Sequence, residues 1–335
     1  MNNTKNDPGL MTLAIRMVVG WTYFSAFYRR VILADKLDPA GAGYIGEKFN
    51  HFLPNALGIK PIIQYLVENP DALWWAMVVF TIIEGIVGLF IIFGLFTRLM
   101  SIGVFGLAMG ILLGSGWIGT TCLDEWQIGV LGIATGFTLF LTGSGMYSVD
   151  NYLMRRNHPW TQKKWFPWIG SGTIPLKDKI FPGFVLTGSL VILGLTLMTN
   201  QVFHNGLWGN LHNKSVKPKL EITAGQLNNG LTFDVYRTEG VDVYGAWIIG
   251  IELTDDQNNT IFSLSNDELA DLDSRHIDNY YVARVKPGKH SLVIPLGAKA
   301  KMHLDQDPLM DLPAGQYTLT ITDISGASWK HDIVK

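Results

Sequence analysis

The segment 114–129, GSGWIGTTCLDEWQIG, holds the residue types of this chain that are best suited to chemistry. It contains Cys122, the only cysteine among 335 residues, and Asp124 and Glu125 follow at once. A thiol in a polar loop near cationic groups becomes nucleophilic, whereas a buried free cysteine is usually inert. The spacing makes Cys122 a candidate nucleophile and the two carboxylates candidate acid–base groups. An inert Cys122 is the alternative.

Trp126 and Gln127 come directly after the two acids and are candidate substrate contacts. An indole and an amide beside a thiol can contact and orient a small reactant. Trp117 and Trp126 fit an aromatic belt at a membrane surface equally well, because tryptophan is enriched at that depth. Both interpretations stay open at this point.

Arg29 and Arg30 are a second group of candidate substrate-binding residues. Guanidinium forks suit compact oxyanions because they form paired bonds to two oxygens and keep their charge. Two alternatives remain: the arginines contact lipid headgroups, or Asp124 and Glu125 only hold them in place.

The first apolar stretch repeats its polar and aromatic residues at alternating steps of four and three, which places them on one helix face. That face is too polar to meet lipid, so we expect it to face other helices, and Tyr23 becomes a candidate substrate contact. The residues are Arg16, Gly20, Tyr23, Phe27 and Arg30.

Glu84 lies inside the second apolar stretch, with Thr81 and Gly88 on the same side. An ionisable residue at that depth is costly and is a functional candidate by default. It either lines a quinone or proton path, or it ties helices together by bonding Tyr23 or Arg16.

Composition excludes several classes of protein. A net charge of −2 without a dense basic run argues against nucleic-acid binding. One cysteine excludes internal disulfides and multi-thiolate metal sites. The eight histidines are scattered without ligand spacing on a helix face, so we expect no metal. No haem, flavin or iron–sulfur motif is present.

Apolar runs dominate the chain up to about residue 200, and five of them approach the length of about 20 residues that spans a bilayer. Frequent glycines inside them favour close helix packing in lipid. We expect a four-helix bundle and a fifth transmembrane helix, formed by stretches 10–33, 72–95, 98–118, 126–146 and 181–200.

The distribution of Lys and Arg predicts the orientation. Segment 147–180 carries six of them and should be cytoplasmic, so the N-terminus is inside and the C-terminal domain lies outside, on the periplasmic side of the inner membrane. Arg29 and Arg30, at the outer end of the first helix, break the rule.

Two segments between the apolar stretches carry predictions of their own. Segment 147–180 is either an interfacial stretch or an ordinary linker. Loop 34–71 predicts a re-entrant or surface helix that caps the bundle.

After residue 213, about seven short segments alternate apolar and polar residues between turn signals such as Asn229-Gly230. This pattern predicts an immunoglobulin-like β-sandwich. The predicted strands are LEITAGQL, LTFDVYRT, AWIIGIELT, TIFSLS, YYVARV, HSLVIPL and QYTLTITDI. The expected parts are a membrane domain 1–150, a linker 151–180, a fifth helix 181–203 and a sandwich 213–335.

Several of these segments resemble a known family. RMVVGWTYFSAFYRR (16–30) and GSGWIGTTCLDEWQIGVLG (114–132) resemble DoxD, the membrane subunit of thiosulfate:quinone oxidoreductases. EGIVGLFIIFGLFTRL (84–99) is similar to the wider DoxD/DoxX membrane family. The strands ending in PAGQYTLTITDISGASW (313–329) resemble the DoxA subunit. The resemblance covers nearly the whole chain, as a fusion of both subunits.

The resemblance implies that two thiosulfates are oxidised to tetrathionate while a membrane quinone, the co-substrate, is reduced. In our hypothesis Cys122 carries a covalent thiosulfate adduct, and Asp124, Glu125 or Glu84 supplies protons to the quinol. Direct electron transfer is the alternative route. Two rival functions stay open: a non-catalytic membrane scaffold, and quinone-linked oxidation of another sulfur species. The sequence does not decide whether the chain forms a homo-oligomer.

Overall fold

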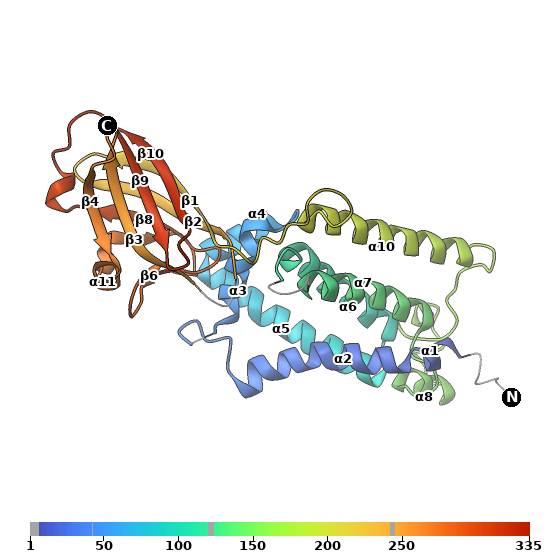
Figure 1. The fold of residues 1–335 in the computed structure, drawn as a ribbon. Coiled ribbons are helices and arrows are strands. Elements are labelled where there is room, and N and C mark those ends of the chain that lie inside the picture. The colour runs from blue at the N-terminus through green and yellow to red at the C-terminus, as the bar shows by residue number, and fades with distance from the viewer. Residues whose placement is uncertain (1–6, 42, 120–123, 242–244) are drawn as a thin grey trace. The chain divides into compact units, whose positions relative to one another are not determined.

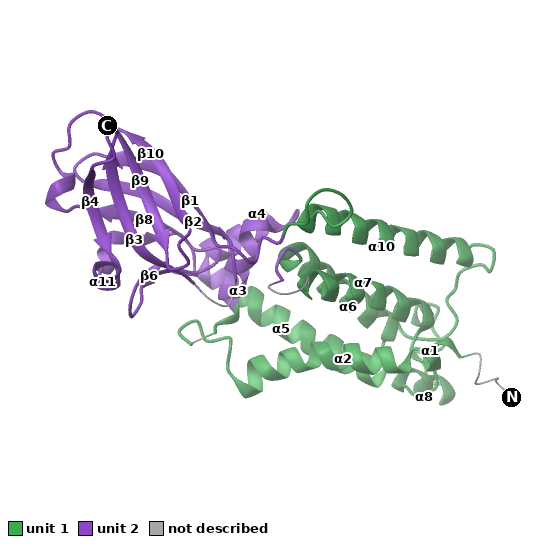
Figure 2. Ribbon diagram, in the orientation of Figure 1, with its two compact units in different colours: residues 1–45, 74–116, 123–212 green, residues 46–73, 117–122, 213–335 purple. Residues whose placement is uncertain are grey.

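The computed structural model describes residues 7–41, 43–119, 124–241 and 245–335. Two compact units emerge from their contacts, one built mainly of helices and one mainly of strands (Figures 1 and 2). The predicted fold class, a bundle of apolar helices followed by a sandwich of two antiparallel sheets, is confirmed.

Long helices make up the first unit, and they coincide with the five apolar stretches. Short helices accompany them: α1 (Pro8–Met11), α8 (Val149–Arg155) and α9 (Phe166–Ile169). The long helices are α2 (Leu13–Tyr28), α5 (Pro70–Phe93), α6 (Thr97–Ser115), α7 (Asp124–Thr142) and α10 (Phe181–His204).

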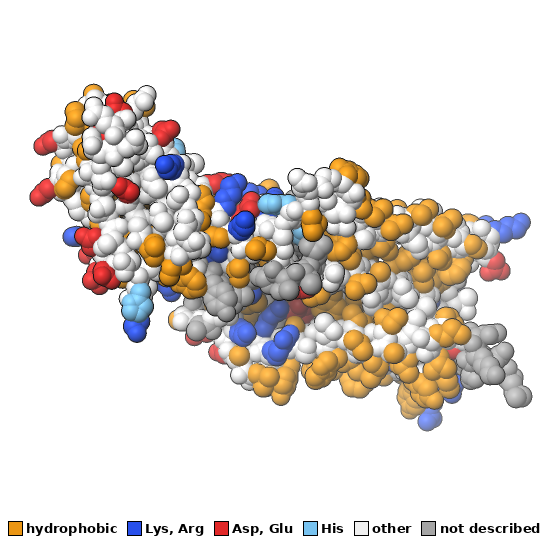
Figure 3. All heavy atoms as spheres, viewed as in Figure 1, with side chains coloured by type: hydrophobic (Ala, Val, Ile, Leu, Met, Phe, Trp, Pro, Cys, Tyr) orange, Lys and Arg blue, Asp and Glu red, His pale blue; other side chains and the backbone are white. Residues whose placement is uncertain are grey.

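Three helices in the described part of the chain are long and apolar enough to cross a membrane: α5, α6 and α10. None of the apolar window of α10 is buried, and Figure 3 shows hydrophobic side chains along the surface of the helical unit. Helix α2 has only 16 residues, and α7 carries two acids in its first turn. The chain is a membrane protein, and the number of five spans stays a prediction.

Helices α2 and α5 approach closely because both carry glycine where they meet. A Cβ at Gly20 would lie 2.9 Å from the carbonyl oxygen of Gly88, and a Cβ at Gly88 would collide with the backbone nitrogen of Phe24. About two turns further along α2 and one turn earlier in α5, the ring of Phe27 covers Gly85. This contact sets the distance across which side chains of α2 reach α5.

Segment 147–180 is held against the helical unit by a buried polar network. Asp150 accepts hydrogen bonds from the backbone nitrogens of Phe96 and Thr97 and from the Ser171 hydroxyl, at 2.9, 3.1 and 2.8 Å. The Arg98 guanidinium donates to the carbonyl oxygens of Phe140, Pro167 and Gly172. Arg98 therefore anchors the segment, a role that the sequence did not indicate.

The second unit contains a four-stranded and a six-stranded antiparallel sheet, with order β1-β2-β8-β5 and β10-β9-β3-β7-β6, and β4 paired to β3. Its core lies between them. The first sheet comprises β1 (Lys219–Leu227), β2 (Leu231–Glu239), β5 (Ile277–Asn279) and β8 (Lys299–Leu304). The second comprises β3 (Ala246–Asp255), β4 (Thr260–Ser265), β6 (Lys286–Pro287), β7 (Leu292–Ile294), β9 (Gln316–Asp323) and β10 (Ser328–Val334).

One predicted strand, YYVARV at 280–285, is wrong. Of the backbone nitrogens described in this segment, only that of Tyr280 bonds a strand, at the Lys299 carbonyl oxygen of β8. Further on, side chains take the place of a strand: the Ala283 nitrogen donates to Asn50 Oδ1 at 3.1 Å and the Val285 nitrogen to Asn279 Oδ1 at 2.7 Å. Four strands were missed: the short β5 and β6, and the longer β8 and β10. In β8 the buried residues are Ala300, Met302 and Leu304, which alternate with lysine and histidine and give a weak strand signal.

Loop 34–71 forms α3 (Ile45–Phe52), a 3₁₀ turn and α4 (Lys60–Glu68), so helix is present where it was expected, and its role as a cap of the bundle stays a prediction. Residues 46–73 belong to the sandwich unit. Asn50, fully buried, donates to the carbonyl oxygen of Gly297 at 2.7 Å and accepts from Ala283. The membrane half of the sequence thus supplies two helices to the β unit.

Candidate functional site

A buried ion pair joins α2 to α5. The Arg30 Nη1 atom bonds the Glu84 Oε2 atom, and the two side chains are 18% and 4% exposed. The guanidinium also lies over the Phe80 ring, 5.7 Å from its centroid. A carboxylate inside an apolar bundle needs such a partner, because unpaired burial of charge is costly. Glu84 ties helices through Arg30, and not through Tyr23 or Arg16.

The two neighbouring arginines differ in environment because α2 ends in a π-helical turn, Arg29–Leu33. Arg29 is exposed and its Nε donates to the carbonyl oxygen of Ser25 at 3.3 Å. Arg30 points to Glu84. π-helical turns often occur at functional sites. The turn therefore presents one guanidinium to solvent and one to a buried acid.

Thr81 stands one helical turn before Glu84 and is 1% exposed. Its hydroxyl has no hydrogen-bond partner among the described residues. A buried hydroxyl without a partner costs about 1–3 kcal/mol, so its presence calls for an explanation. Thr81, Glu84 and Arg30 together offer a donor, an acid and a cation within the bundle.

The predicted stripe on α2 faces the bundle, as expected. Tyr23 is 6% exposed, and its hydroxyl donates to the carbonyl oxygen of Val104 at 3.4 Å. Phe27 covers Gly85, and Arg16 bonds the carbonyl oxygens of Ser144 and Tyr147. Tyr23 is thus engaged with α6 in this structure.

Helix α7 opens with the predicted acids and amide. Asp124 and Glu125 lie in its first turn, where carboxylates complement the helix dipole. Asp124 and Gln127 are exposed. Figure 1 shows that α7 begins at the end of the helical unit where α2 and α10 finish. The acids and the paired arginines therefore belong to the same end of this unit.

Trp126 contacts α10. Its indole nitrogen donates to the Thr199 hydroxyl at 3.0 Å, and its ring meets the His204 ring edge-on. His204 is fully buried and donates through Nε2 to the carbonyl oxygen of Gly116 at 2.9 Å. The sequence did not predict Thr199 and His204 as site residues. Their signal there is weak: both are polar residues near the end of an apolar stretch.

Cys122 lies outside the described residues, but the three residues 117–119 that lead toward it are described. Trp117 is fully buried, and its indole nitrogen donates to the carbonyl oxygen of Phe52 at 3.2 Å. The Gly119 nitrogen donates to the Ser215 hydroxyl at 2.9 Å, and the Gly119 carbonyl accepts from Ser215 Oγ and Asn213 Nδ2 at 2.6 Å each. The start of the sandwich thus holds Gly119 by both backbone groups.

Among the described residues no group of three or more His, Cys, Asp or Glu is arranged to hold a metal ion. The described residues of the site provide cationic, acidic and hydroxyl side chains at one end of an apolar bundle. Side chains of these types are chemically able to bind an anion and to transfer protons.

Comparison with protein families agrees with this chemistry. Residues 11–177 match the family of the TQO small subunit DoxD, and residues 203–332 match that of the TQO small subunit DoxA. The chain is therefore a membrane protein built from both subunits of one enzyme class. It belongs to the thiosulfate:quinone oxidoreductase (TQO) DoxD and DoxA families, joined in one polypeptide.

The buried pair predicts a double-mutant signature. Arg30→Met or Glu84→Leu alone leaves a buried charge without its partner, and we expect each to destabilise the helical unit by about 3–5 kcal/mol. The double variant removes both charges and should recover much of that loss. Thermal unfolding of the detergent-solubilised protein measures this. Additive losses in the double variant would show that the two side chains do not form a stabilising pair.

Proposed function

We propose that this chain oxidises two thiosulfates to tetrathionate and passes both electrons to a membrane quinone. The observation that carries the proposal is the match of both halves to the DoxD and DoxA subunits of one oxidoreductase. The arginine and acid groups of the helical unit support it, because the substrate is a small dianion and the quinone takes up two protons.

Cys122 is the proposed nucleophile in the covalent route. Its thiolate adds to the quinone with uptake of one proton. A first thiosulfate then attacks the cysteine sulfur, and the carbon–sulfur electron pair leaves with the ring, which takes a second proton as quinol. A second thiosulfate attacks the sulfane sulfur of the Cys122–thiosulfate adduct. Tetrathionate departs and the thiolate is regenerated, so the two electrons balance.

Arg29 and Arg30 are the proposed anion-binding residues. Two dianions must approach each other to form the sulfur–sulfur bond, and guanidinium charge offsets their repulsion. Arg29 is the more available of the two, because it is exposed while Arg30 bonds Glu84. Three further residues are proposed to contact the reactants: Trp126, Gln127 and Tyr23.

The proposed proton donors are Glu84, Asp124 and Glu125. Glu84 with Arg30 and the Thr81 hydroxyl forms a buried polar group beside an apolar surface, an arrangement suited to a quinone that arrives through lipid. Quinone access from the bilayer and anion access from water then converge at one end of the helical unit.

The proposed topology has five transmembrane helices, with the N-terminus inside and the sandwich in the periplasm. Six basic residues in segment 147–180 support it through the positive-inside rule. The proposed parts are residues 1–150, 151–180, 181–203 and 213–335. Arg29 and Arg30 lie on the external side of this topology, where the positive-inside rule does not expect them. Binding of thiosulfate that arrives from outside gives a reason for their position.

Cys122→Ser should abolish thiosulfate-dependent reduction of a quinone analogue by the purified protein in detergent, because serine is a poor nucleophile at neutral pH. An unchanged unfolding midpoint serves as the control for folding. Full activity in Cys122→Ser would refute the covalent route. Wild-type protein that fails to reduce quinone with thiosulfate would favour the scaffold, and faster rates with sulfite or a small thiol would favour another sulfur donor.

Arg29→Gln should raise the KM for thiosulfate about 10- to 100-fold, since a charge-assisted hydrogen bond contributes about 1.5–3 kcal/mol. The quinone KM should stay unchanged. Arg156→Gln is the matched control, because Arg156 is an exposed arginine whose guanidinium lies over the Tyr152 ring in another part of the unit. Equal effects of both variants would mean that only net charge matters.

Ser215→Ala removes one donor and one acceptor from Gly119, three residues before Cys122. A misplaced nucleophile costs up to about 100-fold in rate, so we expect kcat to fall while the thiosulfate KM changes little. Ser325→Ala, at an exposed position in the same unit, is the control. An unaltered kcat in Ser215→Ala would show that this contact does not position the cysteine.

A further inference from the structure

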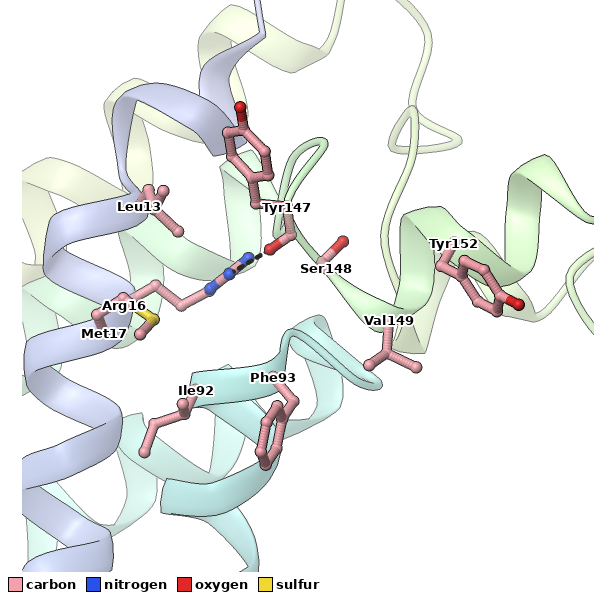
Figure 4. A pocket seen from close by; sticks show the side chains of 9 residues that line it. All are labelled: Leu13, Arg16, Met17, Ile92, Phe93, Tyr147, Ser148, Val149 and Tyr152. Atoms are coloured by element: carbon pink, nitrogen blue, oxygen red, sulfur yellow. Dashed lines mark hydrogen bonds between the residues drawn. The ribbon is translucent and has the colours of Figure 1, made fainter.

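A groove of about 470 Å³ opens on the helical unit beside the first turn of α2. Figure 4 shows its wall of apolar side chains and the guanidinium of Arg16 that reaches toward Tyr147. The apolar wall is formed by Leu13, Met17, Ile92 and Phe93, and Tyr147 and Tyr152 flank it. None of these residues belongs to the proposed catalytic end.

Among the described residues, Arg16 is the only basic one that lines this groove, and it is 2% exposed. Its Nη1 and Nη2 atoms donate to the carbonyl oxygens of Ser144 and Tyr147, the latter at 2.6 Å. Its Nε atom is buried and has no acceptor among the described residues. Burying a charged donor without an acceptor is costly. The unpaired Nε atom therefore indicates that a ligand of this groove should bring a hydrogen-bond acceptor.

Charge around Arg16 is unbalanced. Arg16 and Arg98 both interact electrostatically with Asp150, and all three are buried. Asp150 already accepts four hydrogen bonds, from the backbone and hydroxyl groups of Thr97, the backbone of Phe96 and the hydroxyl of Ser171. Two buried cations share one anion, which leaves this cluster of three with one positive charge.

The depth of the groove fits a lipid headgroup. Arg16 is three residues into α2, which begins at Leu13, and with about 1.5 Å of rise per residue it lies about 4.5 Å from the helix start. Phe93 and Met17 are exposed, so the apolar wall is open to acyl chains at the surface of the unit. Basic pockets between transmembrane helices bind acidic headgroups in this way.

We propose that the groove binds one anionic phospholipid, with a phosphate oxygen accepting from Arg16 and an acyl chain along Met17, Ile92 and Phe93. The lipid phosphate supplies both the missing acceptor and the missing negative charge, whereas the carbonyl oxygens of a neutral quinone supply an acceptor without the charge. The bound lipid joins α2, the end of α5 and segment 147–152 at the membrane surface.

The test uses the full chain, purified in detergent and stripped of lipid. Phosphatidylglycerol, phosphatidylcholine with the same acyl chains, inorganic phosphate and a short-chain quinone are added separately, and native mass spectrometry and thermal unfolding are recorded. Phosphatidylglycerol should bind at one equivalent and raise the unfolding midpoint by several degrees. Phosphatidylcholine should bind more weakly and raise it less.

Met17→Trp fills the groove without removing Arg16 and should abolish the phosphatidylglycerol shift. Val18→Trp is the matched control: Val18 is the next residue of α2, is 67% exposed and does not line the groove, so the shift should persist. Equal shifts with both lipids, an equal shift with inorganic phosphate alone, or displacement of the lipid by the quinone would each overturn the proposal. A full shift in Met17→Trp would overturn it as well.

Discussion

The helical unit depends on one constraint: a charge that enters an apolar bundle must meet its partner there. Arg30 and Glu84 satisfy it between α2 and α5, where Gly20 and Gly88 bring the two backbones together. Because neither group is stable alone at this depth, the pair fixes the rotation of α2 about its own axis. The same rotation turns Tyr23 and Phe27 inward and leaves Arg29 outside.

Sequence periodicity was sufficient for the features that repeat along one element. The stripe from Arg16 to Arg30, the apolar helices and the alternating strands β1 to β4 and β9 follow from local pattern. The helix in loop 34–71 also followed from its apolar residues.

Features that depend on distant partners could not be predicted in the same way. The partner of Glu84 is 54 residues away, and no local pattern selects Arg30 over Tyr23 or Arg16. YYVARV carries a strand pattern, but Asn50 and Asn279 satisfy backbone nitrogens that a neighbouring strand would otherwise bind. The predicted nucleophile, Cys122, lies outside the described residues, so its role rests on residue type and family resemblance.

The contacts of Gly119 with Asn213 and Ser215 give the fusion of the two subunits a physical meaning. The family matches end at residue 177 and resume at 203, and α10 occupies most of the interval. With one continuous backbone, the residues that hold Gly119 are present at a fixed effective concentration instead of arriving by diffusion. The two halves are therefore made in one-to-one stoichiometry, and dilution in the membrane does not separate them.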